Sequence, residues 1–379
     1  MIKIIDKYIF KELLPPFFVS LIFFSFIFLL SRILDIADMI VNFNVSFGSI
    51  IKLVIYSISF FLQYTIPMSV MMAVLFVFIE LTGSNETLAL KSGGVSVLRL
   101  LPPLLVFCII GSFLTAFMTF YGLPWGKFSF KKEAIEIAKN NMAVSFKEKT
   151  FIDSFQGFSL YINEIDQEKG IMKDIFLEDM STGEIPVTIT APQGRIIPIK
   201  NGYLVELLNG SFIQIDKKEE SVHKTGFGKY SFSLDFPESL NPGNVKNKDE
   251  KEMYFNELKA HIKSFDKKTS KYYSALLKMH EKFSLPAASI FLGIIGFALG
   301  LRNKTGKKSS GIIYGIFLFV FYYILLALGL SLGESKPEVY PPFAAMWVPN
   351  IIMFGLGIFL LYLAIKEKNI NFKFFGKIK

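Results

Sequence analysis

Charged residues are scarce in this sequence, and six long stretches of it contain none. Lys, Arg, Asp and Glu together make up 19% of the 379 residues, whereas hydrophobic residues make up 52% and the mean hydropathy is +0.44. A soluble globular chain usually carries about 25% charged residues. The shortage of charge therefore excludes an ordinary soluble protein and indicates a membrane protein.

Cysteine and histidine are also rare, which limits the chemistry that the chain can perform. The single Cys108 excludes a disulfide framework and, because it falls within an apolar run, is interpreted as an inert buried thiol. His223, His261 and His280 are scattered and interpreted as solvated or structural. The sequence also lacks a Walker-type phosphate loop, a Rossmann glycine pattern and a paired-cysteine metal site. We predict no catalytic residues, no metal site and no cofactor.

The six charge-free runs are predicted to be membrane spans. Each supplies the roughly 20 apolar residues needed to cross about 30 Å of hydrocarbon. The runs cover residues 13–31, 53–79, 100–126, 283–301, 309–333 and 339–365. An ion-coupled transporter would keep a charged or titratable side chain inside such spans. All six runs lack such a side chain, which argues against secondary transport. The energy for any transport would therefore have to come from a partner.

The N-terminal segment MIKIIDKYIFKELL alternates apolar and charged residues at helical spacing. It is predicted to lie along the membrane interface before the first span. The first run is too long for the apolar core of a cleaved signal peptide, begins with Pro15-Pro16 and has no small-residue cleavage site. We therefore expect it to remain as an anchor.

Lysine and arginine are distributed unevenly between the two sets of short loops. One set contains most of them, and the other offers Arg32, Lys52 and Lys336 beside acidic residues. Because positive residues favour the cytoplasmic side, both termini are predicted to be cytoplasmic. The richer set is Lys3, Lys7, Lys11, Lys91, Arg99, Arg302, Lys304, Lys307, Lys308, Lys366, Lys368, Lys373, Lys377 and Lys379. The net charge of +9 is explained by this bias and gives no reason to expect nucleic-acid binding.

Residues 127–282 are too many for a loop and predict a folded periplasmic domain. The stretch KFSFKKEAIEIAKNNMA indicates a helix, and residues 251–282 return to a helical pattern after the linker PESLNPGNVKNKDE. Five segments with β character lie between them, separated by turn formers, and one contains an Asn209-Gly210 hairpin signal. They are GFSLYINEI, IMKDIFLEDM, VTITAPQGRIIPI, GYLVELLNGSFIQID and VHKTGFGKYSFSLDF.

Strands at this spacing, without helices between them, predict an antiparallel sandwich or jelly roll with its core at about 146–236. The predicted fold class is thus a polytopic α-helical membrane protein with an inserted β-domain. Its predicted parts are an N-terminal membrane half (1–126), a periplasmic domain (127–282) and a C-terminal membrane half with a basic tail (283–379).

A short amphipathic segment interrupts the apolar sequence at residues 80–99, in a loop predicted to be cytoplasmic. Ser84 or Asn85 can cap a helix that begins near Glu86, and Gly93-Gly94 can end it. Such a helix is what a cytosolic motor domain would need to grip. A solvated surface turn explains the same residues, and both interpretations stay open at this point.

The segment ETLALKSGGVSVLRLLPP resembles the coupling-helix motif of the lipopolysaccharide export permease family, LptF/LptG. Six further segments resemble the family in the same order, so the resemblance covers the whole chain, and it is closer to the LptF branch. They are IDKYIFKELLPPF, SRILDIADMIV, TIPMSVMMAVL, LPWG, HEKFSLP and PPFAAMWVPN. Glu281 departs from the pattern, because the family more often has a basic residue there.

The resemblance implies a transport subunit without catalytic activity in the inner membrane of a Gram-negative bacterium. Its implied partners are an LptG-like six-span subunit, a dimeric cytosolic LptB-like ABC ATPase, periplasmic jelly-roll bridge proteins and lipopolysaccharide. The implied contacts with the ATPase involve Glu86, Leu88, Ala89, Leu90, Gly93, Gly94 and Arg99.

The resemblance also implies where the lipid would bind. Arg32 and Lys52 are the cations available for headgroup phosphates, although they could instead pair with Asp35 and Asp38 or snorkel to the interface. Alternating apolar residues of the β-domain would normally form a closed core, but by resemblance part of that interior opens as a path for acyl chains. The predicted path residues are Leu160, Ile162, Phe176, Ile189 and Leu204.

Three other interpretations remain at the level of the sequence. An envelope enzyme would need convergent catalytic side chains in the outer domain, where charges are dispersed. A sensor or scaffold would usually carry a sizeable cytoplasmic output domain, and the cytoplasmic parts here are short. The sister LptG-type subunit would change the partner and little else.

Overall fold

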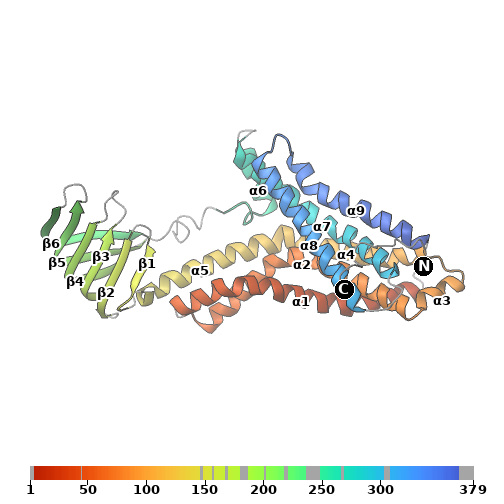
Figure 1. Cartoon of the computed structure of the whole chain (residues 1–379), viewed down its shortest axis with the longest axis horizontal. Helices are drawn as coiled ribbons and strands as arrows, with labels where there is room; N and C mark the ends of the chain where they lie inside the picture. The colour runs from red at the N-terminus through yellow and green to blue at the C-terminus, as the bar shows by residue number, and fades with distance from the viewer. Residues whose placement is uncertain are drawn as a thin grey trace, which may run out of the picture. The chain divides into compact units, whose positions relative to one another are not determined.

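The computed structural model describes residues 4–43, 45–145, 148–155, 158–166, 170–179, 187–199, 202–216, 221–235, 248–265, 269–302 and 308–366 (Figure 1). The chain divides into two compact units, which are described separately. The first comprises Met1–Arg32, Ile55–Phe128 and Asp249–Lys379, and the second comprises Ile33–Val54 and Ser129–Lys248.

Six helical stretches within the described ranges are long and apolar enough to cross a membrane, which agrees with the predicted number. They are formed by α1 (Ile4–Phe43), α2 (Phe47–Gly83), the continuous α4 (Leu101–Phe117), η2 (Met118–Gly122) and α5 (Leu123–Ser145), then α7 (Ser270–Arg302), α8 (Lys308–Ser335) and α9 (Pro342–Ile365). Shorter helices are α3 (Glu86–Ser92), η1 (Val97–Leu100) and α6 (Phe255–Lys263). The two predicted helical segments that flank the β-domain are confirmed by α5 and by α6 with the start of α7.

The N-terminal segment is part of the first long helix. We expected a separate interfacial helix, but α1 runs without a break through Pro15 and Pro16. Ile9 and Phe17, which lie before and after the two prolines, are buried in one apolar cluster with Leu104 of α4. Packing against a neighbouring helix thus holds this segment in line with the rest of α1, and prolines are tolerated inside such membrane helices.

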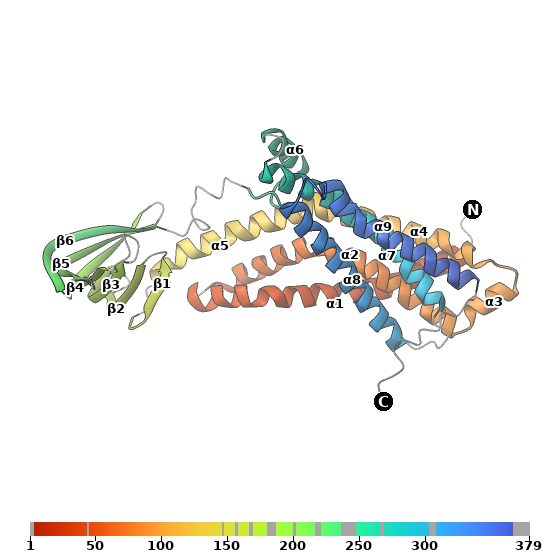
Figure 2. The same ribbon diagram turned by 45° about the horizontal axis from the view of Figure 1, so that its top comes forward.

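In the first unit, α7 lies alongside α9 and α4 (Figure 1; Figure 2). Small residues allow its backbone to approach other helices closely, as is common in membranes. At Gly296, an added Cβ atom would lie 2.6 Å from the backbone oxygen of Met71 in α2. Cys108 of α4 is buried against Gly293, as expected of a packed thiol.

Buried polar side chains tie the last three spans together. The Asn350 amide nitrogen of α9 donates to the backbone oxygen of Ser284 in α7 (2.8 Å), and Tyr322 of α8 donates to the Asn350 side-chain oxygen (3.2 Å). Ser284 in turn donates to the Met346 carbonyl (2.7 Å). A network whose members satisfy one another in this way specifies a single helix arrangement.

The third span contains one turn of π-helix. The π turn η2 joins α4 to α5, so the helix continues from Leu101 to Ser145 without a loop. Such turns are rare, occur mostly as single-turn bulges inside α-helices, and are frequent at functional sites.

The second unit contains a six-stranded antiparallel sheet whose order follows the sequence (Figure 1). The strands are β1 (Phe151–Phe155), β2 (Phe158–Asp166), β3 (Ile171–Asp179), β4 (Val187–Ile199), β5 (Gly202–Asp216) and β6 (Ser221–Asp235). The five predicted segments correspond to β2–β6, and the short β1 was not predicted. An antiparallel sheet is confirmed, whereas a jelly roll or sandwich is not, because the described strands form one sheet in sequence order.

A crease crosses five strands of this sheet. In β3 the core residues Met172 and Ile175 lie three positions apart, and in β5 Leu207 and Phe212 lie five apart. An odd spacing places side chains on opposite faces of a regular strand, so each strand changes its inward face between these positions. The register places the changes in one row, formed by Asn163, Asp174, Pro192, Asn209 and Gly228.

The crease corrects two predictions. Asn209-Gly210 is not a hairpin turn, because β5 pairs with β4 and β6 on both sides of it; Asn209 has instead a left-handed φ of 52°, and Asp174 in the same row has one of 50°. Asn and Asp tolerate this conformation better than most residues. Phe176 and Leu204 alternate with buried neighbours in their strands, so both point away from the core that they were predicted to line.

The sheet also curls. Phe158 of β2 and Phe232 of β6 are stacked with their ring centroids 5.6 Å apart, although three strands lie between β2 and β6. In a flat sheet those strands would be about 19 Å apart. Beside this contact, burial and then the charge of Asp179 on β3 raise the pKa of Tyr230 on β6. The curl therefore encloses an apolar interior, which includes Leu160, Ile162 and Ile189.

Candidate functional site

The loop between α2 and α4 contains the predicted short helix. Glu86 begins α3 and Gly93 follows its last residue, with the Gly93 N–H donating to the Ala89 carbonyl (3.0 Å) and Gly94 in a left-handed conformation (φ 81°). Asn85 occupies the capping position, but its side chain makes no capping hydrogen bond within the described structure. The predicted helix and its glycine end are thus confirmed, and the predicted side-chain cap is wrong.

The residues predicted to contact the ATPase divide into two groups. Leu88 is 59% exposed, and Ala89, Gly93 and Gly94 are exposed with it. Leu90 instead packs toward the apolar cluster formed by α1, α2 and α4. Leu98 in η1 adds a second large apolar side chain to the exposed side of this loop.

Glu86 and Arg99 are engaged within the chain. The Glu86 carboxylate accepts a hydrogen bond from the Tyr8 hydroxyl (3.1 Å) and another from the Ser84 hydroxyl (3.0 Å). The Arg99 guanidinium donates two hydrogen bonds to the Asp6 carboxylate, both 2.8 Å long. Both contacts join the loop to the first turns of α1.

Arg32 lies over an aromatic ring that a second cation also approaches. Its guanidinium carbon is 5.4 Å from the centroid of the Phe60 ring, and the Lys127 ammonium is 5.9 Å from the same centroid. Cation–π contacts of this length are attractive and leave a charged group able to bind an anion. Lys127 was not predicted, because it falls at the edge of a charge-free run rather than within a motif.

Lys52 belongs to the second unit and has a different environment. Its ammonium forms an ion pair with Glu133 of α5 (3.2 Å), beside an apolar cluster of Ile36, Leu53 and Ile137. Pairing with Asp35 or Asp38 involves side chains outside the described set. The structure therefore gives Arg32 and Lys52 separate surroundings, each in its own unit.

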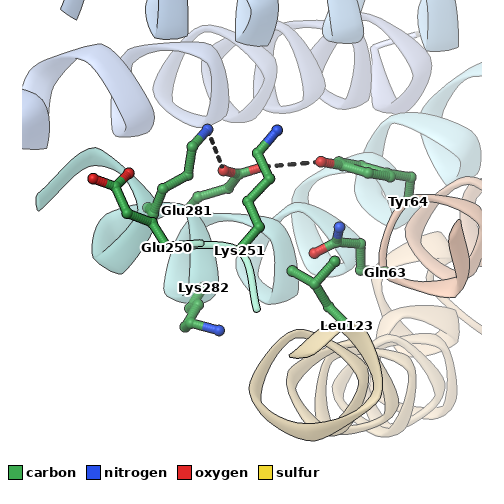
Figure 3. Close-up of a pocket in the computed structure, with 8 residues that line it drawn as sticks. Gln63, Tyr64, Leu123, Glu250, Lys251, Glu281 and Lys282 are labelled. Atoms are coloured by element: carbon green, nitrogen blue, oxygen red, sulfur yellow. Dashed lines mark hydrogen bonds and ion pairs between the residues drawn. The ribbon is translucent and has the colours of Figure 1, made fainter. Parts of the chain in front are cut away.

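A buried charged cluster lies in the first half of α7 (Figure 3). The Lys278 ammonium pairs with Glu281 (3.1 Å), and the Tyr64 hydroxyl of α2 donates to the other Glu281 oxygen (2.9 Å). Lys278, Glu281 and Lys282 are only 8%, 6% and 4% exposed. The three residues line a small pocket with Gln63, Tyr64, Leu123, Glu250 and Lys251.

Lys282 connects α7 with the π turn. Its ammonium donates to the backbone oxygen of Thr119 in η2 (2.9 Å), and the Thr119 hydroxyl donates to the Lys282 backbone oxygen (3.2 Å). A bulge of this kind leaves backbone carbonyls that need other donors. The lysine supplies one where the helix changes its geometry.

The cluster precedes the charge-free run that was predicted as the fourth span. That run was drawn from residue 283, where the charges end, whereas the helix that contains it, α7, already begins at Ser270. Lys278 and Glu281 lie three residues apart, which places them on one helix face. That spacing was the available signal, whereas the partners Tyr64 and Thr119 are too distant in sequence to be recognised.

The described residues contain no group of three His, Cys, Asp or Glu side chains that could hold a metal ion. His280 lies on α7 with its ring 5.7 Å from that of Phe343, and His261 lies on α6 against Phe265. His223 is exposed on β6.

Six membrane-length helices with an antiparallel sheet inserted after the third define a polytopic membrane protein. Residues 7–363 match the family of the lipopolysaccharide export system permease LptF/LptG. The chain belongs to this family. It is 22% identical over 311 residues to the uncharacterized protein RP871 of Rickettsia prowazekii (strain Madrid E), a match that covers 80% of this chain and 83% of that protein.

Membership implies a permease of lipopolysaccharide export, which is a multi-pass inner-membrane protein and a transport subunit rather than an enzyme. It also implies a permease heterodimer that works with an LptB ATPase on lipopolysaccharide.

Proposed function

We propose that the chain is the LptF-type subunit of an ATP-driven lipopolysaccharide extractor. In this proposal it pairs with an LptG-like permease over a dimeric cytosolic LptB-like ATPase, and it passes the lipid to periplasmic bridge proteins. Both termini are cytoplasmic, and residues 127–282 are periplasmic. The observation that carries the proposal is the family match over residues 7–363, and the exposed apolar face of α3 between two spans supports the motor contact. The sister LptG-type role is the alternative.

The lipid is proposed to contact the chain in two places. Arg32, with Lys127 at the same aromatic ring, would bind headgroup phosphates, and Lys52 would contribute from its ion pair with Glu133. The enclosed interior of the curled sheet, around Leu160, Ile162 and Ile189, would receive acyl chains. Lipopolysaccharide combines these two chemistries, because it has several acyl chains and a phosphorylated headgroup.

The motor contact is tested by copurification. We expect the wild-type chain, extracted gently from its membrane, to bring with it a nucleotide-binding subunit, a second six-span protein and lipopolysaccharide. Glu86→Ala should lower the recovery of the nucleotide-binding subunit about tenfold, since a hydrogen bond to a charged group contributes about 1.5–3 kcal/mol.

Tyr8→Phe is the matched control for this variant. It removes the internal hydrogen bond to Glu86 and leaves the carboxylate available to the ATPase. Normal recovery with Tyr8→Phe and reduced recovery with Glu86→Ala would support the motor contact. Normal recovery and export with Glu86→Ala would contradict it.

The headgroup contact is tested by photo-crosslinking to lipopolysaccharide. Arg32→Glu should reduce crosslinking about tenfold while assembly stays near normal, because it replaces an attraction for phosphate by a repulsion. Lys52→Glu, in the other unit, is the comparison and should have the smaller effect, since Glu133 already neutralises Lys52. Parallel losses of crosslinking and assembly with Arg32→Glu would indicate a structural role instead.

A further inference from the structure

The loop between α2 and α4 is fastened to α1, a helix to which it is not directly connected in sequence. Arg99 holds Asp6 with two parallel hydrogen bonds of 2.8 Å. Such a two-point contact fixes the orientation of both side chains as well as their distance. The side chains are 30% and 15% exposed, so the pair is partly shielded from water.

A hydrogen bond and an apolar cluster also hold the same turns of α1. At the other end of the loop, Glu86 accepts the hydrogen bond from Tyr8, two residues after Asp6. Between these polar contacts, Ile9 and Leu13 of α1 share an apolar cluster with Leu90 and Leu100. The loop therefore contacts α1 at two places: the start of the loop through Glu86 of α3, and the end of the loop through Arg99.

α1 is one continuous helix, so its first turns and its outer part move together. Arg32 lies about 26 residues after Asp6 on the same helix, which corresponds to about 39 Å along its axis. A displacement of the loop that was transmitted only through the chain would reach α2 and α4. The contacts at Asp6 and Tyr8 would transmit the displacement to α1 as well. This helix carries Arg32, the proposed headgroup cation.

We propose that the Asp6–Arg99 ion pair transfers the motion of α3 to α1, so that Arg99 is a positioning residue for transport rather than a contact for the ATPase. This inference rests on the proposed function. A partly exposed ion pair adds little to stability, and the apolar cluster already attaches this part of α1. The fixed two-point geometry of the pair suits the transfer of a displacement, which a sliding apolar contact transmits less faithfully.

The test uses the complete complex in proteoliposomes and compares lipopolysaccharide released to an acceptor with ATP hydrolysed. Asp6→Asn keeps the shape of the side chain and removes its charge. We expect assembly and ATP hydrolysis within about twofold of wild type, whereas lipid released per ATP falls about tenfold. Asp6→Arg alone should behave in the same way. Asp6→Arg combined with Arg99→Glu restores an ion pair of reversed polarity and should recover at least half of the wild-type ratio.

Each outcome bears on the inference. A wild-type ratio with Asp6→Asn, or a reversed pair that assembles but does not recover the ratio, would overturn it. If the single variants fail to assemble, the test depends on the reversed pair alone, and the ratio of lipid released to ATP hydrolysed is compared with wild type. A wild-type complex without the ATPase or without lipopolysaccharide would instead contradict the proposed function. A loss of ATP hydrolysis in step with transport in Asp6→Asn would place Arg99 and Asp6 at the motor contact and would also overturn the inference.

Discussion

Glu281→Ala will destabilise the first unit by about 3–5 kcal/mol, because the substitution leaves the ammonium of Lys278 buried without its carboxylate partner. The same substitution removes the acceptor of the Tyr64 hydrogen bond that joins α2 to α7. We expect a lower midpoint of thermal unfolding for the purified protein in detergent. Size-exclusion chromatography of samples heated to a series of temperatures measures this midpoint.

A double variant separates the ion pair from the space that it fills. Replacing a whole buried pair by apolar residues of similar volume is often neutral or stabilising. Lys278→Met with Glu281→Leu should therefore unfold well above Glu281→Ala and near wild type. If Glu281→Ala unfolded at the wild-type temperature, the carboxylate would have to be solvated, in conflict with its 6% exposure.

Gly296→Val will destabilise the contact between α2 and α7 by about 3 kcal/mol, the upper end of the usual range for overpacking. The first added carbon would already lie 2.6 Å from the Met71 backbone oxygen and 3.3 Å from the Leu75 backbone nitrogen. Backbone atoms cannot rotate away as a side chain would, so the two helices must separate. Reduced yield of folded protein and a lower unfolding midpoint would report this separation.

Gly355→Val is the matched control, because it makes the same change inside another apolar helix. Apart from its chain neighbours and the adjoining backbone of α9 itself, no described residue has a heavy atom within 4 Å of a Cβ added at Gly355. Both substitutions change helix propensity equally. The difference between their destabilising effects therefore measures the cost of disturbing the close contact between α2 and α7. Equal effects of the two substitutions would show that the α2–α7 contact can open without cost.

The membrane spans were predictable because the hydrocarbon imposes a simple requirement on composition and length. The same requirement did not locate the start of α7. A search for charge-free runs marks only the apolar part of a helix, so it omitted the charged residues that precede Phe283. Tyr64 and Thr119 satisfy Glu281 and Lys282 across 217 and 163 residues of sequence, and no local pattern announces such pairs.

Local sequence signals predicted the short helix of the candidate site. The orientation of its side chains depends on tertiary contacts, which local sequence does not show. Acidic, small and glycine residues in the order found at Glu86–Gly94 were enough to predict α3 and its end. The direction of Arg99 depends on Asp6, which lies 93 residues earlier. The partnership of Arg32 with Lys127 at Phe60 likewise depends on three different helices.

The sheet shows a different limit. Alternation predicted its strands, because period-two burial survives over short stretches. It misplaced Phe176 and Leu204, because alternation alone does not say which of two apolar neighbours points inward. Asn209-Gly210 was a real signal for an unusual backbone conformation, and the structure uses it for the crease instead of a turn.

The π turn in the third span determines the directions, about the helix axis, in which the side chains after it point. One residue more than an α-helical turn is accommodated there, which rotates the subsequent side chains by about 100° relative to an uninterrupted α-helix. The stripe of α4 that packs on α7 therefore does not continue in line along α5, although the backbone has no break. Geometrically, such a turn is equivalent to one residue inserted into a regular α-helix. A deletion at this position would return the helix to one phase and preserve both flanking segments at their full length.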